Sequence, residues 1–460
     1  MPFLSSPPEA VRQQNSFNIV EVSKATTVSR RKLLKGLAGA AVAAPFSSLL
    51  PALAQNAPAK APQVFSPEDD QLLEELEHAI CCYFWEQVNP ATGLVKDRCN
   101  ARKAATDNST VASIASTGFG LTAMCIAERR GYISHSDARQ RVVATLDFLS
   151  HKLPHHRGFF YHWADMNTGE RVWESEVSSV DTAILLCGIL TCRTHFRDTD
   201  ITLLAHGIAN RVEWTWLSED TTLLPHGWRP EMGFLPYRWD YYNEMMMMYL
   251  LGLGSPTYPL RPEAWDAWKR ILFDYEGMRY IGSFAPLFVH QYSQAWFDFR
   301  GKRDRYTDYF QNSITATEVH RRFCIELGKR FPDYSADLWG ITASDSQKGY
   351  VIWGGPPATG PIDGTISPAA AGGSLAFIPQ EAIRVMRTLR DRYPDAWSCY
   401  GFVDALNPLK KWYDTDVIGI DLGITLLMAE NARSSYIWNV FMQNPEAQLG
   451  MQRAGFKPYR

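Results

Sequence analysis

Residues 227–253 read GWRPEMGFLPYRWDYYNEMMMMYLLGL, and the character of this stretch changes halfway along it. Prolines and a glycine in the first half favour irregular backbone. From Met245 to Leu253 the sequence is apolar and carries no charge, which is typical of a helix buried on all sides. We therefore expect a helix over 240–253 that lies inside a large helical fold.

Two carboxylates, Asp240 and Glu244, stand at the start of this expected helix. Residues four apart share one helix face, with Cβ atoms about 5–6 Å from each other. The surrounding Trp and Tyr side chains would partly desolvate both carboxyls and raise the pKa of one of them. Asp240 and Glu244 are therefore candidates for acid catalysis, although acidic residues also favour a helix N-terminus because of its dipole.

Helical periodicity recurs from Pro67 to Met442. The expected helices cover 67–87, 110–130, 135–152, 178–196, 200–217, 240–253, 262–273, 286–299, 306–330, 379–393 and 420–442. Strand signals are local, near 158–163 and 349–353, where short hairpins and aromatic loops would border a cleft. The pattern predicts an all-α fold, with helices paired in an (α/α)6 toroid; an open α-solenoid is the alternative.

The N-terminal segment has the composition of an export signal. Residues 29–35 read SRRKLLK and precede an apolar run that ends in ALA at 52–54. This resembles a twin-arginine signal peptide with its cleavage site, whereas prolines in the apolar run argue against a membrane anchor. We predict a signal peptide over 1–54, a linker over 55–66 and one catalytic domain over 67–460. The prediction implies the twin-arginine export machinery as a partner, a periplasmic or secreted protein, and no stable membrane insertion after cleavage.

Composition narrows the class of ligand. The chain has 460 residues, a net charge of −3, and 15 Trp, 20 Tyr and 23 Phe. Aromatic faces stack on sugar rings, whereas nucleic acids call for basic clusters that the sequence lacks. We therefore expect an oligo- or polysaccharide ligand and no nucleic acid. Neither C-x-x-C nor H-E-x-x-H occurs, so we expect no metal and no cofactor, and the eight cysteines mostly as buried free thiols.

A second acidic segment, WESEVSSVDTA, covers 173–183. Glu176 lies at the mouth of an apolar helix and Asp181 lies within it. A carboxylate in an apolar helix is costly unless it is paired or functional. We assign Glu176 to the site and Asp181 to the scaffold, with Glu174 as a neighbouring alternative to Glu176.

Aromatic and polar side chains along the chain are candidates for sugar recognition. The candidates are Trp228, Arg238, Trp239, Tyr242, His290, Gln291, Tyr292, Trp296, Asp345, Trp353 and Trp412. A lone histidine such as His290 is more often a core residue than a catalytic base, and Asp345 would also suit an Asx-turn.

Several ordered motifs carry a resemblance to a known family. They include TGFGL at 117–121, WDYYNE at 239–244, FVHQY at 288–292, GITASD at 340–345 and YGFVDA at 400–405. With these motifs the chain resembles the bacterial glucoamylase-like family associated with glycoside hydrolase family 144, which has endo-β-1,2-glucanase activity. The resemblance implies an (α/α)6 barrel, no metal, inversion at the anomeric carbon, and essential acids in the segments that match Glu176 and Glu244.

The working hypothesis is an exported, inverting glycoside hydrolase that cleaves β-1,2-glucan internally to sophoro-oligosaccharides. Glu244 would act as the acid, Glu176 as the base, and Asp240 as the group that tunes the pKa of Glu244. A polysaccharide lyase on a similar toroid and a periplasmic glycan-binding protein without turnover are the alternatives.

Overall fold

The computed structural model describes residues 64–219, 221–284, 286–356 and 360–459. The predicted signal peptide over 1–54 and most of the predicted linker lie outside the described residues. Within the described ranges, no helix is both long enough and apolar enough to cross a membrane.

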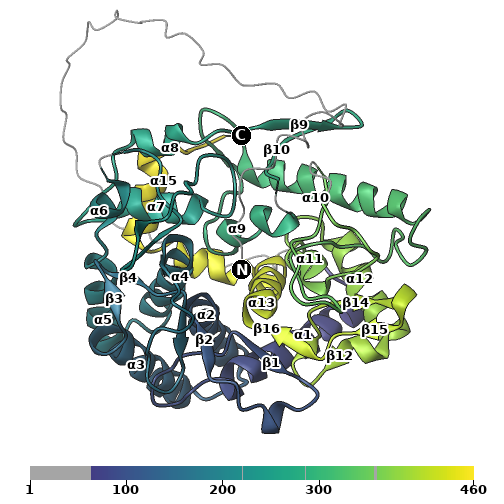
Figure 1. The fold of residues 1–460 in the computed structure, drawn as a ribbon, viewed down its shortest axis with the longest axis horizontal. Helices are drawn as coiled ribbons and strands as arrows, with labels where there is room; N and C mark the ends of the chain where they lie inside the picture. The colour runs from purple at the N-terminus through teal and green to yellow at the C-terminus, as the bar shows by residue number, and fades with distance from the viewer. Residues whose placement is uncertain (1–63, 220, 285, 357–359, 460) are drawn as a thin grey trace, which may run out of the picture.

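Helices dominate the described chain (Figure 1). The α-helices are α1 (Pro67–Glu86), α2 (Ile114–Arg130), α3 (His135–His151), α4 (Ser179–Phe196), α5 (Thr199–Asn210), α6 (Trp214–Ser218), α7 (Met246–Gly254), α8 (Glu263–Ala267), α9 (Tyr292–Trp296), α10 (Tyr309–Leu327), α11 (Pro368–Gly372), α12 (Pro379–Arg392), α13 (Gly419–Ser434), α14 (Tyr436–Phe441) and α15 (Pro445–Arg453). The 3₁₀ turns are η2 (Ala104–Thr106), η3 (Leu287–His290), η4 (Pro394–Ala396) and η5 (Pro408–Lys410).

Strands are short and form small antiparallel ribbons between the helices. They are β1 (Arg98–Asn100), β2 (Val111–Ser113), β3 (His155–His156), β4 (Phe159–Phe160), β5 (Trp163–Asp165), β6 (Val177–Ser178), β7 (Gly227–Arg229), β8 (Gly233–Phe234), β9 (Leu272–Tyr275), β10 (Met278–Ile281), β11 (Lys302–Arg303), β12 (Trp397–Ser398), β13 (Gly401–Phe402), β14 (Leu406–Asn407), β15 (Trp412–Tyr413), β16 (Asp416–Ile418) and β17 (Lys457–Pro458). The largest described sheet has three strands, in the order β6-β7-β8.

The helices form two layers around a common centre (Figure 1). In α2, α4, α7 and α13 nearly every residue is buried, so these helices have neighbours on all sides. In α3, α5 and α12 only one face is buried, as expected for an amphipathic outer helix. This arrangement agrees with the predicted all-α class, and the closure into six helix pairs stays a prediction.

The inner helices α2 and α4 meet at two glycines. A Cβ atom built on Gly188 would lie 2.1 Å from the carbonyl oxygen of Gly118, and one built on Gly118 would lie 2.6 Å from the carbonyl oxygen of Ile184. Both distances are far below van der Waals contact. The two backbones therefore touch only because neither glycine has a side chain.

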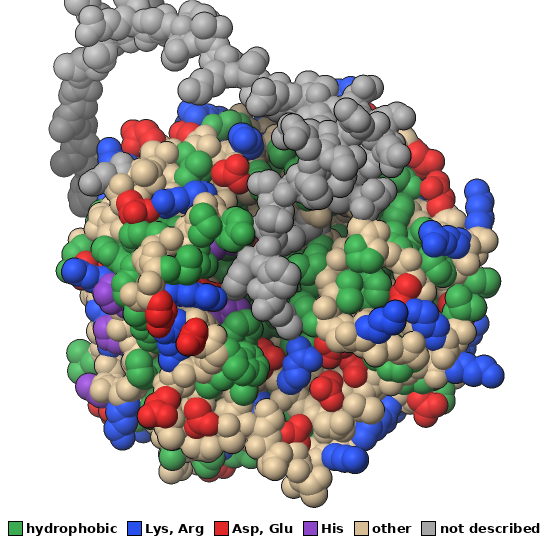
Figure 2. Space-filling model, viewed as in Figure 1, with side chains coloured by type: hydrophobic (Ala, Val, Ile, Leu, Met, Phe, Trp, Pro, Cys, Tyr) green, Lys and Arg blue, Asp and Glu red, His purple; other side chains and the backbone are tan. Residues whose placement is uncertain are grey.

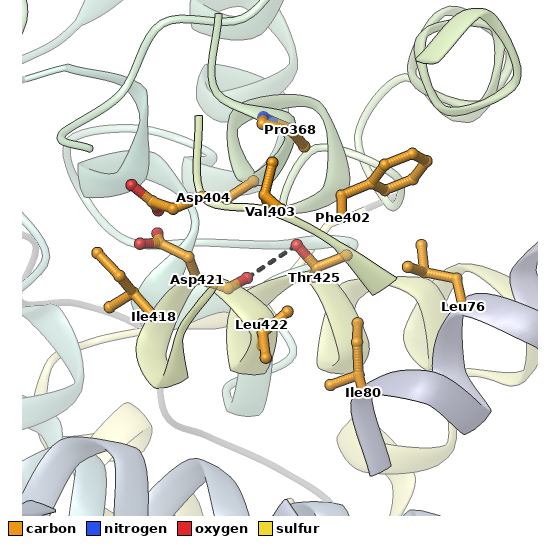
Figure 3. A pocket seen from close by; sticks show the side chains of 11 residues that line it. Leu76, Ile80, Pro368, Phe402, Val403, Asp404, Ile418, Asp421, Leu422 and Thr425 are labelled. Carbon is orange, nitrogen blue, oxygen red and sulfur yellow. Dashed lines mark hydrogen bonds between the residues drawn. The ribbon is translucent and has the colours of Figure 1, made fainter. Parts of the chain in front are cut away.

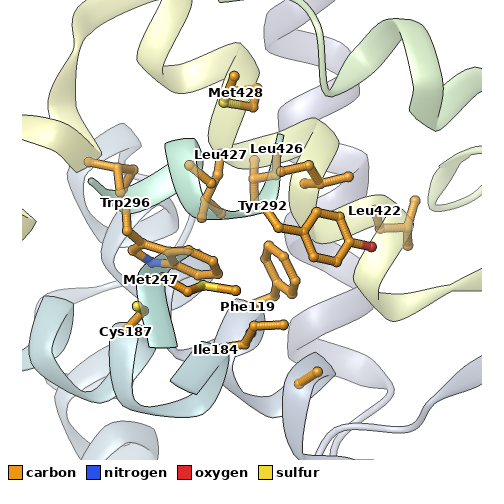
Figure 4. Packing of buried hydrophobic residues seen from close by; sticks show 14 of the residues in the cluster. Phe119, Ile184, Cys187, Met247, Tyr292, Trp296, Leu422, Leu426, Leu427 and Met428 are labelled. Carbon is orange, nitrogen blue, oxygen red and sulfur yellow. The ribbon is translucent and has the colours of Figure 1, made fainter. Parts of the chain in front are cut away.

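The methionine run Met245–Met248 lies in this core, and all four side chains are fully buried. Figure 4 shows Met247 packed beside Trp296, Phe119 and Ile184. The ring centroids of Phe119 and Trp296 lie 4.9 Å apart. The prediction of a helix without an exposed face is confirmed for α7.

Several predicted boundaries are wrong. The helix expected over 240–253 begins only at Met246, and the one expected over 262–273 ends at Ala267, after which β9 and β10 form a hairpin. Residues 200–217, 286–299 and 420–442 each divide into two helical pieces, and α11 and α15 were not expected. A hairpin near 158–163 is present, whereas near 349–353 the described chain has only isolated bridges, Ser344 with Val351 and Gln347 with Gly349.

The cysteines are all free thiols. Cys81, Cys99, Cys125, Cys187, Cys192 and Cys324 are buried, whereas Cys82 is half-buried and Cys399 is exposed. The prediction that most are buried free thiols is confirmed.

Candidate active site

Glu244 lies in the turn that leads into α7. The Ser293 hydroxyl donates to the Glu244 carbonyl oxygen at 2.6 Å and accepts from the Met247 N–H at 2.9 Å, which anchors this turn to α9. Burial raises the pKa of the Glu244 carboxyl to about 8, and the charge of Asp181 adds to the effect. Glu244 is therefore protonated at neutral pH and can act as a proton donor.

The predicted pairing of Asp240 with Glu244 on one helix turn is wrong. The segment before α7 is extended, because Tyr242 N–H donates to the Lys269 carbonyl and Lys269 N–H donates to the Asp240 carbonyl, at 2.8 and 2.7 Å. The Asp240 carboxylate is 38% exposed and lies 3.8 Å from the Lys269 ammonium. Asp181, and not Asp240, is the carboxylate that raises the pKa of Glu244.

The imidazole of His162 lies between the carboxyl groups of Glu176 and Asp181. His162 Nδ1 lies 3.1 Å from Glu176 Oε1, and His162 Nε2 lies 3.5 Å from Asp181 Oδ2. Burial alone would lower the pKa of His162, but the two carboxylates outweigh it and raise the pKa to about 9. Burial would in turn raise the pKa of Glu176, but the hydrogen bond and charge of His162 lower it overall. At neutral pH an imidazolium therefore links two carboxylates.

Local structure explains how these three side chains are positioned. Ser178 caps α4: its hydroxyl accepts from the Asp181 N–H at 3.2 Å and donates to Asp181 Oδ2 at 2.6 Å. Glu176 precedes β6, whose pairing with β7 brings Arg229 to 3.6 Å from Glu176 Oε2. The side chain of Glu176 is 3% exposed and that of Asp181 14%. Asp181 is therefore the member of the pair with more access to solvent.

Tyr292 marks the centre of the site. Burial raises the pKa of its phenol far above the usual range, and the nearby charges of Asp421, Glu244 and Asp181 act in the same direction. These three acids come from α13, from the turn before α7 and from α4, so helices distant in sequence bring them around one phenol. Figure 4 shows Tyr292 beside Phe119, with Leu422 of α13 nearby.

Four residues predicted to contact substrate belong to the core instead. Tyr242 and Trp296 are fully buried, and Gln291 and His290 are 1% and 5% exposed. Their polar atoms bind other protein groups, as in the 3.0 Å contact between Tyr242 Oη and His290 Nδ1. Trp296 donates to Thr122, and Gln291 donates to the Ala370 carbonyl and to Ser374. The prediction that these four contact sugar is wrong, because their side chains are buried and their polar atoms are already bound to other protein groups.

Two of the predicted aromatic residues lie beside Glu176. Trp228 pairs with Val177 through the backbone, and its ring stacks on His156 with centroids 4.0 Å apart. Trp239 is buried, stacks on His226 and donates to Ser179 Oγ at 3.0 Å. Tyr292 lies among the acids, as described above. Arg238 pairs with Glu219 and is not brought to the acids.

The remaining predicted residues lie in later loops and hairpins of the chain. The Asp345 carboxylate pairs with Arg98 Nη1 at 2.7 Å, and Trp353 Nε1 donates to Ser344 Oγ at 2.9 Å. Trp412 lies in the β14-β15 hairpin. One oxygen from each of Asp345, Asp404 and Asp414 lies within 4.8 Å of the other two, which is a spacing that could hold a metal ion.

Sequence reasoning missed His162 and the roles of Asp181 and Asp421. The pattern S-x-x-D at 178–181 is an N-cap signature that places Asp181 at a helix mouth, but it does not reveal the partner. His162 lies between β4 and β5, 14 residues before Glu176, and nothing in the sequence around it ties it to Glu176.

The surface around the site is mixed in charge. Figure 2 shows acidic and basic side chains interspersed with hydrophobic ones over the described part of this face. A single-sign basic patch of the kind that binds polyanions is not seen on the part of this face that the structure describes.

The chain is similar to a known protein family and to solved structures. A family model named Glycoamylase, described as "Putative glucoamylase", matches residues 236–445, which include Glu244 and Asp421. This segment of the chain is similar to that glucoamylase-like family. The matched segment begins after His162, Glu176 and Asp181, which lie nearer the N-terminus.

Similarity to individual proteins extends over most of the chain. It is 28% identical over 425 residues to an exo β-1,2-glucooligosaccharide sophorohydrolase of Parabacteroides distasonis; the match covers 84% of this chain and 58% of that protein. It is also 28% identical to an endo-β-1,2-glucanase from Chitinophaga pinensis solved with sophorotriose and glucose, with a TM-score of 0.79 over 85% of this chain and 98% of that one. A β-1,2-glucanase from Parabacteroides distasonis gives a TM-score of 0.77 at 26% identity, over 84% and 60% of the two chains.

Proposed function

We propose that this protein is a glycoside hydrolase that cleaves β-1,2-glucan. The observation that carries the proposal is that Glu244 keeps its proton at neutral pH, while a charged His162 links Glu176 and Asp181 nearby. The protein is also similar to β-1,2-glucan hydrolases. One carboxyl that keeps its proton and one that has lost it are what glycoside hydrolysis requires. The aromatic-rich composition suits a neutral sugar chain.

In the proposed reaction, Glu244 gives its proton to the glycosidic oxygen as the bond from that oxygen to the anomeric carbon breaks. A water molecule attacks the anomeric carbon from the opposite face, and the base takes a proton from that water. The product has the inverted anomeric configuration. This mechanism places the acid and the base about 6.5–9.5 Å apart so that a water molecule fits between base and substrate.

Asp181 is our proposal for the base, with Glu176 as its positioning partner through His162. Asp181 is the more exposed of the two, and it is the one whose charge acts on Glu244. Glu176 is held by His162 on one oxygen and by Arg229 on the other. The alternative is that Glu176 is the base, and the variants Asp181→Asn and Glu176→Gln distinguish the two assignments.

We further propose internal cleavage of the glucan. The chain spans 98% of the endo-acting relative but only 58% of the exo-acting one. Endo action predicts a mixture of sophoro-oligosaccharides early in the reaction, whereas exo action predicts release of sophorose alone.

Export through the twin-arginine pathway to the periplasm or beyond is a separate proposal. It rests on the SRRKLLK segment at 29–35. Replacing both Arg30 and Arg31 by Lys should leave the protein in the cytoplasmic fraction of a bacterial host. Unchanged export of that variant would contradict the proposal.

The deciding experiment incubates residues 55–460 with linear β-1,2-glucan, β-1,3-glucan and starch, and follows the products by chromatography. We expect turnover of the β-1,2-glucan only, with inverted products by proton NMR. The variant Asp181→Asn should lose turnover while Glu176→Gln keeps a measurable fraction; the reverse order would make Glu176 the base. Tight binding without turnover would indicate a glycan-binding protein, and unsaturated products would indicate a lyase.

A further inference from the structure

Three aspartates from separate segments converge beside α13. Asp345 follows the Gly340–Ser344 segment, Asp404 follows β13, and Asp414 follows β15. One carboxylate oxygen from each lies within 4.8 Å of the other two. The three residues are only 7%, 3% and 8% exposed, so this is a buried cluster and not a solvated acidic surface.

Each of these carboxylates binds protein donors with one oxygen only. Asp404 Oδ2 accepts from the Asp345 N–H at 2.6 Å, Asp345 Oδ2 accepts from Arg98 at 2.7 Å, and Asp414 Oδ1 accepts from the N–H groups of Thr415 and Asp416 at 2.7 and 3.1 Å. The second oxygens, Asp345 Oδ1, Asp404 Oδ1 and Asp414 Oδ2, are buried and have no hydrogen-bond donor among the described residues. A buried oxygen without a partner costs free energy, so these positions call for a partner of their own.

A fourth carboxylate is directed at the same place. Asp421, in the first turn of α13, is 7% exposed, and within the described chain its Oδ2 has no donor other than the neighbouring Asp404 carboxyl. Figure 3 shows the Asp421 and Asp404 carboxylates next to each other at one end of a largely apolar pocket. The Arg98 guanidinium is the cation paired with this group, and it is shared with Asp97. Negative charge therefore exceeds positive charge locally.

We propose that Asp345, Asp404 and Asp414 bind a calcium ion, with Asp421 facing it. Calcium binds oxygen ligands at about 2.3–2.6 Å, so two oxygens that share one ion are at most about 5 Å apart. The three aspartate oxygens all lie within 4.8 Å of one another and meet this condition. Magnesium usually keeps several waters and binds through one or two carboxylates, whereas this cluster offers three, and zinc prefers nitrogen and sulfur ligands that the cluster lacks. The ion connects three loops to the end of α13 that carries Asp421.

The test is a calorimetric titration of Ca²⁺ into the full chain stripped of metal with a chelator, at mildly alkaline pH, with thermal unfolding measured in parallel. We expect one bound ion per chain and a higher Tm with Ca²⁺ than with chelator. Mg²⁺ should give a clearly smaller shift. No binding would overturn the proposal, because protons or water would then satisfy the orphan oxygens, and equal responses to Ca²⁺ and Mg²⁺ would overturn the choice of calcium.

Two matched variants test the ligand set. Asp414→Asn removes a ligand charge and should weaken Ca²⁺ binding at least about ten-fold. Asp416→Asn makes the same chemical change two residues away, outside the three ligands, and should keep binding within a few-fold. Equal loss in both variants would refute these ligands. If Asp414→Asn does not fold, Asp345→Asn takes its place, and the wild-type titration decides by itself whether an ion binds.

Discussion

The negative charge of Asp181 acts on Glu244: together with burial it raises the pKa of the Glu244 carboxyl to about 8. The first residue lies in the first turn of α4, and the second lies in the turn before α7. The cap formed by Ser178 and the anchor formed by Ser293 fix these two positions. The Glu244 carboxyl therefore keeps its proton at neutral pH.

Replacing Glu244 with Gln should lower kcat/KM on β-1,2-glucan by about 10²- to 10⁴-fold, because the amide has the same shape and no proton to give. Binding of oligosaccharide, followed by calorimetry, should persist. The control is Asp240→Asn in the same segment, which should stay within a few-fold of wild type. A larger loss for Asp240→Asn than for Glu244→Gln would reject Glu244 as the acid.

The dependence of kcat/KM on pH in the wild type should show the titration of Glu244. Glu244 has a pKa of about 8, so kcat/KM on glucan should fall as the pH rises above that value and the proton is lost. An aryl substrate whose leaving group is 4-nitrophenolate needs little protonation, and its alkaline limb should therefore weaken or vanish. The same alkaline limb for both substrates would mean that another group titrates.

His162→Gln should destabilise the protein, because it leaves two buried carboxylates without their cation. The cost is about 3 kcal/mol, the low end for a broken buried pair, since the His162 side chain is 20% exposed. The folded-state pKa of about 9 exceeds the ordinary 6.5, so this stability is fully present below about pH 6.5 and is lost as the pH rises through about 9.

Denaturant unfolding of wild type and His162→Gln, below about pH 6.5 and above about pH 9, measures this contribution to the free energy of unfolding. The difference between wild type and variant should shrink at the alkaline end. The exposed pair of His151 and Asp147 is the control: His151→Gln should change stability by about 0.5 kcal/mol or less. A difference for His162→Gln that does not change with pH would contradict a charged imidazole.

Gly188→Ala should be strongly destabilising, because its Cβ would lie 2.1 Å from a backbone oxygen of α2. We expect a loss of about 3 kcal/mol, the upper range for overpacking, because backbone cannot rotate aside as a side chain can. Gly207→Ala in α5 is the matched control. Its Cβ meets no atom within 4 Å, and it should gain about 0.5–1 kcal/mol from helix propensity. Equal effects of the two substitutions would rule out a close crossing of α2 and α4.

The long helices were predictable because their signals are local. α1 begins after the Ser66 cap with Pro67 as its first residue, and α3 begins after Ser134, each within a residue or two of the expected boundaries. The start of α7 was not predictable. Residues 240–242 pair with Lys269, and such long-range backbone pairing overrides the helical preference of the segment.

The candidate site was predictable in part. Glu244 and Glu176 stand out as acids beside aromatic residues, whereas His162 becomes informative only when the backbone at Tyr161 pairs with Val177 of β6. Trp296 and Tyr242 were misassigned because an aromatic side chain reads the same in a core as in a sugar cleft. Burial depends on the three-dimensional arrangement of helices, which a single segment does not contain.

Oxidation of the four consecutive methionines at 245–248 can report local opening of the protein around α7. Thioether sulfurs at the surface react readily with peroxide, but these four have no exposed area in the folded state. Their oxidation therefore requires α7 to separate from its neighbours, so the rate at which peroxide adds oxygen to this peptide measures how often the region around Glu244 opens.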